Sequence, residues 1–189
     1  MLFPLLAFAQ TNSAPLGVGD AVPDVGLRDE WDRPVRLRTL ITEKPTVLVF
    51  YRGGWCPYCS RHLQALAGIE HQIEQAGAQL LAVSTDKPEK LRQTPDRHKL
   101  HCRLFSDRDA EAARAFGIAF RVDDATLARY KQMGLDLEEA SGRDHHLLPH
   151  PSVFITDTSG RIRFAHVNPD YKVRLEPERI MASLREVLR

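Results

Sequence analysis

Runs of apolar residues, separated by short polar turns, divide most of this chain into strands and helices. Two runs, residues 46–51 and 79–84, lack the polar alternation of a half-exposed strand, which is typical of strands buried on both faces of a parallel or mixed sheet. Between them, apolar residues recur at helical spacing from 63 to 73, so a helix is predicted that ends near Gly77. A buried strand, a helix and a second buried strand in this order indicate an α/β chain.

The rest of the chain extends the same pattern. Residues 152–156 and 161–165 read as strands and flank the turn Asp157-Thr158-Ser159-Gly160, which predicts a β-hairpin. The whole order predicts a central mixed β-sheet with helices on both faces. Further strands are expected at 35–37 and 104–105, and further helices at 87–99 (interrupted near Pro95), 110–116, 123–133 with an aspartate N-cap, and 177–188.

Composition and charge fit one globular domain. The chain has 189 residues, 43% of them hydrophobic, and its basic and acidic residues are interspersed and leave a net charge of +1. No basic patch marks a surface for nucleic acid or an anionic membrane, so neither partner is expected. The domain is expected to occupy residues 17–189.

The first residues are apolar and end in Ala7-Phe8-Ala9, which resembles a signal-peptide cleavage site. The apolar stretch is short and no Lys or Arg precedes it, so residues 1–16 are interpreted as an N-terminal extension or a signal-peptide remnant. This favours a periplasmic protein, with the cytoplasm as the alternative. The stretch is too short to cross a bilayer, and no stable membrane insertion is expected.

Two cysteines carry the clearest chemical signal. Cys56 and Cys59 stand three residues apart, directly after a two-glycine turn that follows the first buried strand. Pro57 favours the first helical position, which places Cys56 at or next to the N-cap, where backbone N–H groups and the helix dipole stabilise an anion. Such positions lower a thiol pKa from about 8.5 to between roughly 3.5 and 7.5. Cys56 is therefore predicted to be the attacking thiol, and Cys59, one turn further in, the resolving thiol.

A structural zinc site is the main alternative for this pair. It needs two more ligands, and no second CxxC or HxxxH pair is present, so thiol redox chemistry is favoured and neither a metal nor a cofactor is expected. The candidate ligands are His62, His98, His101 and Cys102. Cys102 itself is interpreted as a buried core residue, with a second resolving cysteine as the alternative. A loop containing His145, His146 and His150 is interpreted as solvated rather than metal-binding.

From Val18 to Leu188 the chain resembles the peroxiredoxin-like branch of the alkyl hydroperoxide reductase and thiol-specific antioxidant family, which has a thioredoxin-like fold. The similar segments are Val18-Gly19-Asp20-Ala21-Val22-Pro23-Asp24, Phe50-Tyr51-Arg52-Gly53-Gly54-Trp55-Cys56-Pro57-Tyr58-Cys59, residues 105–107 and residues 168–174. The resemblance implies an oxidoreductase that reduces hydroperoxides, with sulfenic acid forming on Cys56 and then a disulfide with Cys59. It also implies a thioredoxin- or glutathione-type reductant, and leaves a homodimer open.

Two departures from the family pattern affect this expectation. Peroxiredoxins share a Pro-x-x-x-Thr-x-x-Cys signature, but here Val49 and Gly53 occupy the proline and threonine places. Arg52 is a candidate for the cation that peroxiredoxins bring from a distant strand, the alternative being a solvent-facing strand end. Because of these departures, a thiol–disulfide oxidoreductase acting on protein partners is the alternative function.

Other residues near the pair have expected supporting roles. Pro151 stands where thioredoxins carry a cis-proline, so the resemblance favours a cis His150–Pro151 bond and a His150 backbone that binds substrate. Trp55 is expected to pack over Cys56, or to be a plain core residue. Tyr51 and Tyr58 are expected either to donate a hydrogen bond near the thiolate or to cover the helix start.

Overall fold

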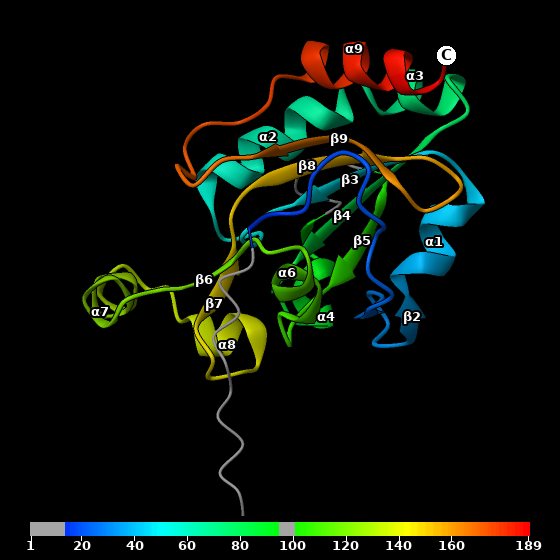
Figure 1. The fold of residues 1–189 in the computed structure, drawn as a ribbon. Coiled ribbons are helices and arrows are strands. Elements are labelled where there is room, and N and C mark those ends of the chain that lie inside the picture. Colours follow the sequence, from blue (N-terminus) through cyan, green and yellow to red (C-terminus); the bar gives the residue numbers. More distant parts are fainter. Residues whose placement is uncertain (1–13, 95–100) are drawn as a thin grey trace, which may run out of the picture.

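The computed structural model describes residues 14–94 and 101–189, and within them most strands form one mixed sheet (Figure 1). Its strand order is β2-β1-β5-β4-β3-β8-β9, with β3, β4 and β5 parallel to one another and β8 antiparallel to β3. A small antiparallel sheet, β6-β7, lies apart from it. The strands are β1 (Gly26–Arg28), β2 (Pro34–Arg36), β3 (Thr46–Phe50), β4 (Gln79–Ser84), β5 (Arg103–Ser106), β6 (Ala119–Arg121), β7 (Leu147–Pro149), β8 (Ser152–Thr156) and β9 (Ile162–Val167).

Helices cover both faces of the large sheet. α2, α3 and α9 lie together on one face, while α1 and α6 lie on the other (Figure 1). α7 and α8 extend away from the main sheet, beside the small β6-β7 sheet. The helices are α1 (Leu37–Glu43), α2 (Pro57–Ala67), α3 (Glu70–Gln75), α4 (Pro88–Leu91), α6 (Glu111–Ala115), α7 (Asp124–Gln132), α8 (Leu137–Ser141) and α9 (Pro177–Val187).

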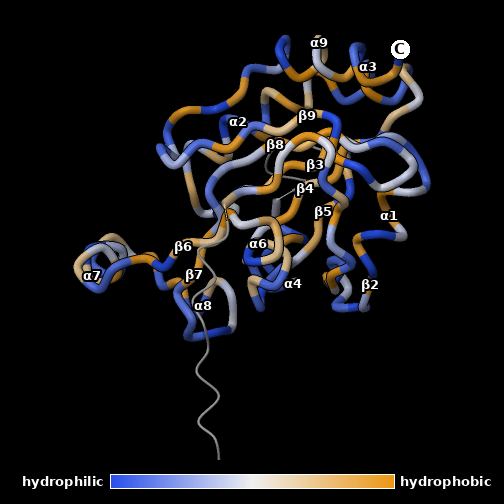
Figure 2. Tube along the Cα trace, viewed as in Figure 1, coloured by the Kyte–Doolittle hydropathy of each residue, from blue (hydrophilic) through white to orange (hydrophobic). Residues whose placement is uncertain are grey.

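β3 shows why the central strands are apolar throughout. Val47 and Val49 pack under α2 and α9, whereas Leu48 and Phe50 point into the opposite core with α1 and α6. All four side chains are at most 1% exposed. Figure 2 shows the same concentration of apolar residues along the central strands. The predicted mixed sheet with helices on both faces is confirmed.

Several boundaries predicted from the sequence are also confirmed. β8 and β9 form the expected antiparallel hairpin, and Asp123 caps α7 by accepting a hydrogen bond from the Thr126 N–H at 2.9 Å. The helical region predicted to end near Gly77 does end there, with α3 at Gln75, but its predicted continuity is wrong, because α2 ends at Ala67 and α3 begins at Glu70. The sequence analysis also missed α1, α8 and the β6-β7 sheet.

Two expectations fall partly outside the described residues. Only α4 is seen in the region predicted to be helical from 87 to 99, and residues 95–100 are outside the described part. Residues 1–13 are outside it as well, so the signal-peptide interpretation stays a prediction. Within the described part, none of the helices has the length and apolar character needed to span a membrane.

Candidate thiol redox site

The turn between β3 and α2 has a shape that requires glycine at position 53. Gly53 has φ +156°, and a Cβ added there would lie 2.2 Å from Trp55 Nε1 and 2.6 Å from Asp86 Oδ1. Any side chain at this position would therefore collide with two neighbouring groups. The turn closes when the Cys56 N–H donates to the Gly53 carbonyl at 3.2 Å, which aims the chain into α2.

Cys56 is the N-cap of α2, and Pro57 occupies the first turn, as predicted. The Cys56 backbone is extended, and its carbonyl accepts the first helical hydrogen bond from Ser60 at 2.9 Å. Cys59 follows one turn later. Both sulfurs are free thiols, and the two residues are only 1% and 0% exposed. The pair thus lies at the start of a helix but beneath the surface.

The surroundings of Cys56 and Cys59 shift the pKa values of their thiols in opposite directions. A hydrogen bond from the Cys59 thiol, together with the Cys59 backbone N–H and the charges of Arg52 and Arg174, lowers the pKa of Cys56 to about 6, although burial opposes this. Burial, and then the neighbouring Cys56, raise the pKa of Cys59 well above its ordinary value. Near neutral pH the arrangement favours a thiolate at Cys56 and a protonated thiol at Cys59.

Arg52 lies inside a cage of aromatic rings rather than in solvent. Its guanidinium carbon lies 4.3 Å from the ring centre of Tyr171, 5.1 Å from that of Trp55 and 5.7 Å from that of Tyr130. The side chain also donates a hydrogen bond to the Tyr130 hydroxyl, and the residue is 3% exposed. The alternative of a solvent-facing strand end is wrong. We refer to Arg52, Trp55, Tyr130 and Tyr171 as the Arg52 cage.

Arg174 supplies a second cation that the sequence analysis did not assign. It lies in the segment between β9 and α9, and its Nη2 donates to Cys59 Sγ at 3.3 Å. The next residue, Leu175, is held by the buried His62, whose Nε2 lies 3.2 Å from the Leu175 carbonyl oxygen. The segment 168–174 had been singled out only as similar to the family, and nothing local indicated which of its residues reaches the thiols.

Asp86 is the other site residue that sequence reasoning missed. It follows β4, is 2% exposed, and accepts a hydrogen bond from the Gly54 N–H at 2.7 Å. Burial raises the pKa of Asp86 to about 7, while hydrogen bonds from Gly54 and the Trp55 side chain act in the opposite direction. Trp55 therefore connects Asp86 to the other members of the Arg52 cage, with its ring centre 6.0 Å from that of Tyr130.

Four further residues had expected supporting roles, and one of these expectations is wrong. The described residues contain no cis peptide bond, so the His150–Pro151 bond is trans and the expectation of a cis-proline is wrong. The His150 ring stacks on Phe120 at 4.5 Å between centroids. Tyr58 meets Tyr171 edge to face at 5.6 Å, whereas Tyr51 is buried in the same core cluster as both cysteines.

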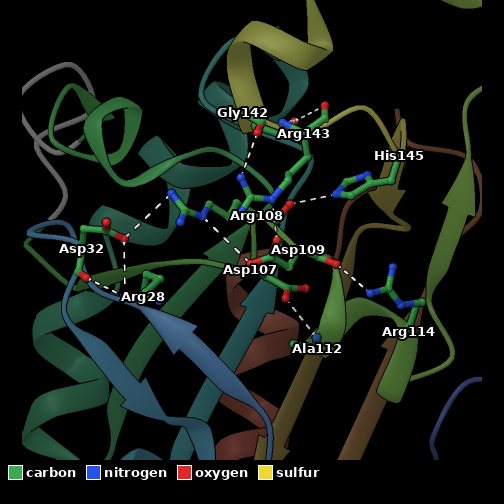
Figure 3. Close-up of polar contacts among 11 residues, drawn as sticks. Arg28, Asp32, Asp107, Arg108, Asp109, Ala112, Arg114, Gly142, Arg143 and His145 are labelled. Carbon is green, nitrogen blue, oxygen red and sulfur yellow. Dashed lines mark hydrogen bonds and ion pairs between the residues drawn. The ribbon is translucent and has the colours of Figure 1, made fainter.

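His145 and His146 precede β7 and His150 follows it, so the expectation that they share one loop is wrong, and their contacts within the described residues do not form a metal site. His145 Nε2 lies 2.8 Å from the Arg108 carbonyl, within a polar network that includes Asp109 and Arg143 (Figure 3). His146 instead contacts Glu138 Oε1 at 2.8 Å. Among the described residues, no group of three or more potential ligands could hold a metal ion. His98, one of the candidate zinc ligands, lies outside the described residues.

Cys102 has a different environment from Cys56 and Cys59. It is half-buried against the core cluster beneath α2, and no disulfide involves it. Burial, followed by the charge of Glu70, raises the pKa of its thiol. A raised pKa makes a poor nucleophile near neutral pH, which agrees with the interpretation as a core residue.

Comparisons with known proteins converge on one family. The model of the AhpC/TSA family matches residues 18–165. Peroxiredoxin Bcp of Escherichia coli (strain K12) is 31% identical over 104 residues, which are 55% of this chain and 66%, just under two thirds, of that protein. The chloroplastic Peroxiredoxin Q of Sedum lineare is 28% identical over 100 residues, which are 53% of each chain.

Solved structures support the fold assignment. The crystal structure of Peroxidoxin BcpB from Mycobacterium tuberculosis superposes with a TM-score of 0.71 at 20% identity, covering 91% of this chain and 98% of that one. Reduced Prx3 from Vibrio vulnificus, solved in complex with H2O2, gives a TM-score of 0.72 at 17% identity, with the same coverage. At these identities the likeness establishes the fold, and the predicted thioredoxin-like fold is confirmed.

Proposed function

The chain belongs to the AhpC/TSA family, and from this premise we propose that it is a thiol peroxidase that reduces hydroperoxides through Cys56 and Cys59. The observation that carries the proposal is the opposite tuning of the two thiols. Cys56 at the helix N-cap has a pKa of about 6, whereas the pKa of its buried neighbour is raised. The relatives named above are peroxiredoxins, which agrees with this chemistry.

The proposed reaction begins with the Cys56 thiolate. Its sulfur attacks the terminal oxygen of the hydroperoxide, the O–O bond breaks, and the alkoxide or hydroxide leaves and takes up a proton. Cys56 becomes a sulfenic acid. The Cys59 sulfur then attacks the Cys56 sulfur, the S–O bond breaks, and water leaves as the disulfide forms. A thioredoxin- or glutathione-type thiol donates the two electrons and two protons that restore both thiols.

Two guanidinium groups are proposed to stabilise the charge that develops in this reaction. Arg52 Nε and Arg174 Nε and Nη1 are buried and have no hydrogen-bond partner in the described part of the chain. Both side chains also help to lower the pKa of Cys56. Unpaired N–H donors beside a nucleophile can bind the oxygens of a peroxide. We therefore propose that these two arginines take over the role of the signature threonine, whose place Gly53 occupies.

A thiol–disulfide oxidoreductase acting on protein partners is the second candidate. Gly53 at the threonine place favours it, but the cis-proline that supported it is absent. Burial also argues against it, because a protein disulfide must reach a Cys56 that is 1% exposed, whereas a small hydroperoxide needs far less room.

The test is the second-order rate constant of the fully reduced protein with hydrogen peroxide, followed by stopped-flow tryptophan fluorescence. A rate constant orders of magnitude above that of a free thiol supports the peroxidase, and Cys56→Ser should abolish it. Cys59→Ser should accumulate a sulfenic acid that dimedone traps after one equivalent of peroxide. Cys102→Ser is the matched control and should keep the wild-type rate constant.

The contrary result is equally informative. A rate constant close to that of a free thiol, with no sulfenic acid trapped in Cys59→Ser, would overturn the peroxidase proposal. The same variant should then trap mixed disulfides with protein partners, which would establish the oxidoreductase.

A further inference from the structure

Access and leaving-group acidity select different sulfurs for the attack that reduces a Cys56–Cys59 disulfide. An incoming thiolate attacks one sulfur, and the other sulfur leaves with the bonding electrons. Acidity favours attack on Cys59, because Cys56, with a pKa of about 6, is the better leaving group. Access favours attack on Cys56. Both residues are buried, but Cys56 lies at the start of α2 beside the exposed Pro57, whereas Cys59 lies one turn further in and is 0% exposed.

Arg174 is placed to make the buried Cys59 an adequate leaving group. Its Nη2 donates a hydrogen bond to the Cys59 sulfur at 3.3 Å. Its other two nitrogens, Nε and Nη1, are buried and have no hydrogen-bond partner among the described residues, so they do not draw the guanidinium towards another group. A cation at hydrogen-bond distance stabilises a thiolate more than the neutral thiol.

Contacts on both sides of Arg174 fix it relative to α2. On its C-terminal side, the Nε2 of the buried His62 lies 3.2 Å from the Leu175 carbonyl oxygen. On its N-terminal side, the Tyr171 ring meets the Tyr58 ring edge to face at 5.6 Å. Both His62 and Tyr58 belong to α2. The helix that carries the resolving thiol therefore also holds the segment that carries the guanidinium.

The environment of Cys59 changes once Cys56 is joined to a reductant. In the reduced protein, burial and then Cys56 raise the pKa of Cys59, while the charge of Arg174 and the Arg52 backbone N–H act in the opposite direction. In a mixed disulfide, Cys56 is neither a thiol nor a thiolate, so its contribution disappears. The Arg174 guanidinium and the Arg52 N–H then remain to offset the burial of a Cys59 thiolate.

We propose that Arg174 is a catalytic residue of disulfide reduction, because it stabilises the Cys59 thiolate as it leaves. The reductant thiolate attacks the Cys56 sulfur, the Cys56–Cys59 bond breaks, and its electron pair stays on Cys59 beside Nη2 until a proton is taken up from water. A second reductant thiolate then attacks the reductant sulfur of the mixed disulfide, which releases the Cys56 thiolate and the oxidised reductant. This role rests on the disulfide of the proposed function, and it uses Nη2, whereas the proposed peroxide contacts use Nε and Nη1.

The experiment measures how fast the disulfide is reduced in full-length protein oxidised with diamide, so that no peroxide is needed. Reduction by excess 2-mercaptoethanol and, separately, by the uncharged tris(hydroxypropyl)phosphine is quenched with N-ethylmaleimide and followed by intact mass. Both reductants leave the same Cys59 thiolate, so Arg174→Gln should slow both reactions by about threefold or more. Arg174→Lys, which keeps the positive charge, should be slowed less. Lys172→Gln, the matched control, removes a charge from an exposed position of the same segment and should keep the wild-type rates.

Other roles for Arg174 give different results. If Arg174 only closed the site, its loss would expose the disulfide, and both reductions would become faster. If it only attracted the anionic thiolate, the rate with the phosphine would stay unchanged. Either result, or unchanged rates with both reductants, would overturn the proposal.

The position of the mixed disulfide tests the direction of attack in wild-type protein, so this measurement does not depend on the folding of a variant. After brief reduction with excess 2-mercaptoethanol, tandem mass spectra should show the reductant on Cys56 and N-ethylmaleimide on Cys59. The reverse placement would overturn the proposal, and so would a failure of diamide to join the two cysteines. A protein that fails the peroxide test but gives the expected placement and rates would lose the proposed peroxidase function and keep this role of Arg174.

Discussion

The Arg174 guanidinium donates a hydrogen bond to the Cys59 sulfur at 3.3 Å, across 115 positions of sequence. The segment 168–176, between β9 and α9, is held at the site by further contacts of Tyr171 with Arg52 and of Leu175 with His62. These contacts hold the positively charged Arg174 guanidinium beside two buried thiols. Arg174 therefore connects the C-terminal part of the chain to the electrostatics of the two thiols.

Replacing Arg174 with Gln should slow the reaction of Cys56. Loss of the positive charge raises the pKa of the Cys56 thiol, so less thiolate is present below neutral pH. This charge contributes less to the lowered pKa than the Cys59 hydrogen bond does, so we expect a shift of at most about one unit, and the rate constants for alkylation and for peroxide should fall by up to about tenfold at weakly acidic pH. In Arg174→Lys, which keeps the positive charge, both rate constants should fall less than in Arg174→Gln. A pH–rate profile identical to that of the wild type would contradict this role.

The Cys59 thiol should control the acidity of Cys56 through its hydrogen bond. This bond is the largest contribution that lowers the pKa of Cys56 to about 6. In Cys59→Ala the pKa of Cys56 should therefore rise towards the ordinary thiol value of about 8.5, whereas Cys59→Ser keeps an O–H donor and should stay near the wild-type value. The pH dependence of iodoacetamide alkylation measures the pKa of Cys56 in both variants.

The comparison is cleanest in a Cys102→Ser background, where Cys56 is the remaining cysteine. If Cys59→Ala and Cys59→Ser gave the same alkylation profile, the hydrogen bond would not be what stabilises the thiolate.

Features that depend on neighbouring residues were predictable from the sequence. The buried strand β3, the helix start at Pro57, the N-cap position of Cys56 and the β8-β9 hairpin all follow from residues a few positions apart. The shielding of Cys59 followed from the same local geometry, since it lies one turn into α2.

Features that depend on distant segments were not predictable. Asp86 arrives from the end of β4 and Arg174 from beyond β9, and no periodicity or motif indicates which side chain of a segment reaches the thiols. Whether Arg52 faces water depended on Tyr130 and Tyr171, which come from other elements. The cis-proline came from a family resemblance alone, and the actual His150–Pro151 bond is trans.

Gly53→Ala should destabilise the protein because the turn has no room for a side chain. The added Cβ would lie 2.2 Å from Trp55 Nε1 and 2.6 Å from Asp86 Oδ1, and φ is +156°. Unfavourable backbone conformations alone typically cost about 1–3 kcal/mol. The free energy of unfolding, measured in urea, should therefore fall by at least about 1 kcal/mol.

Gly77→Ala separates backbone strain from collision. Gly77 also has a positive φ, of +79°, but nothing lies within 4 Å of its built Cβ. Gly53→Ala should therefore destabilise the chain more than Gly77→Ala does. Equal decreases in the free energy of unfolding would show that the Trp55 and Asp86 side chains move aside at little energetic cost.

The last prediction concerns the buried His62 and the stability of the protein in acid. Burial is the main reason that the pKa of His62 is lowered to about 4, from an unfolded value near 6.5. A group whose pKa is lower in the folded state contributes stability above the unfolded pKa, and this stability is lost as the pH falls through the folded pKa. The window is therefore about pH 6.5 down to pH 4, and the linked loss is on the order of 3 kcal/mol.

His62→Gln keeps an N–H donor for the Leu175 carbonyl but cannot become charged in this range. Its free energy of unfolding should therefore fall less than that of the wild type as the pH is lowered. Asp86 and Asp107 have pKa values raised to about 7 and act in the opposite direction over the same window, so the difference between the two proteins is the informative quantity. The exposed His71→Gln is the matched control and should follow the wild-type curve. Parallel curves for wild type and His62→Gln would show that His62 does not make the fold sensitive to acid.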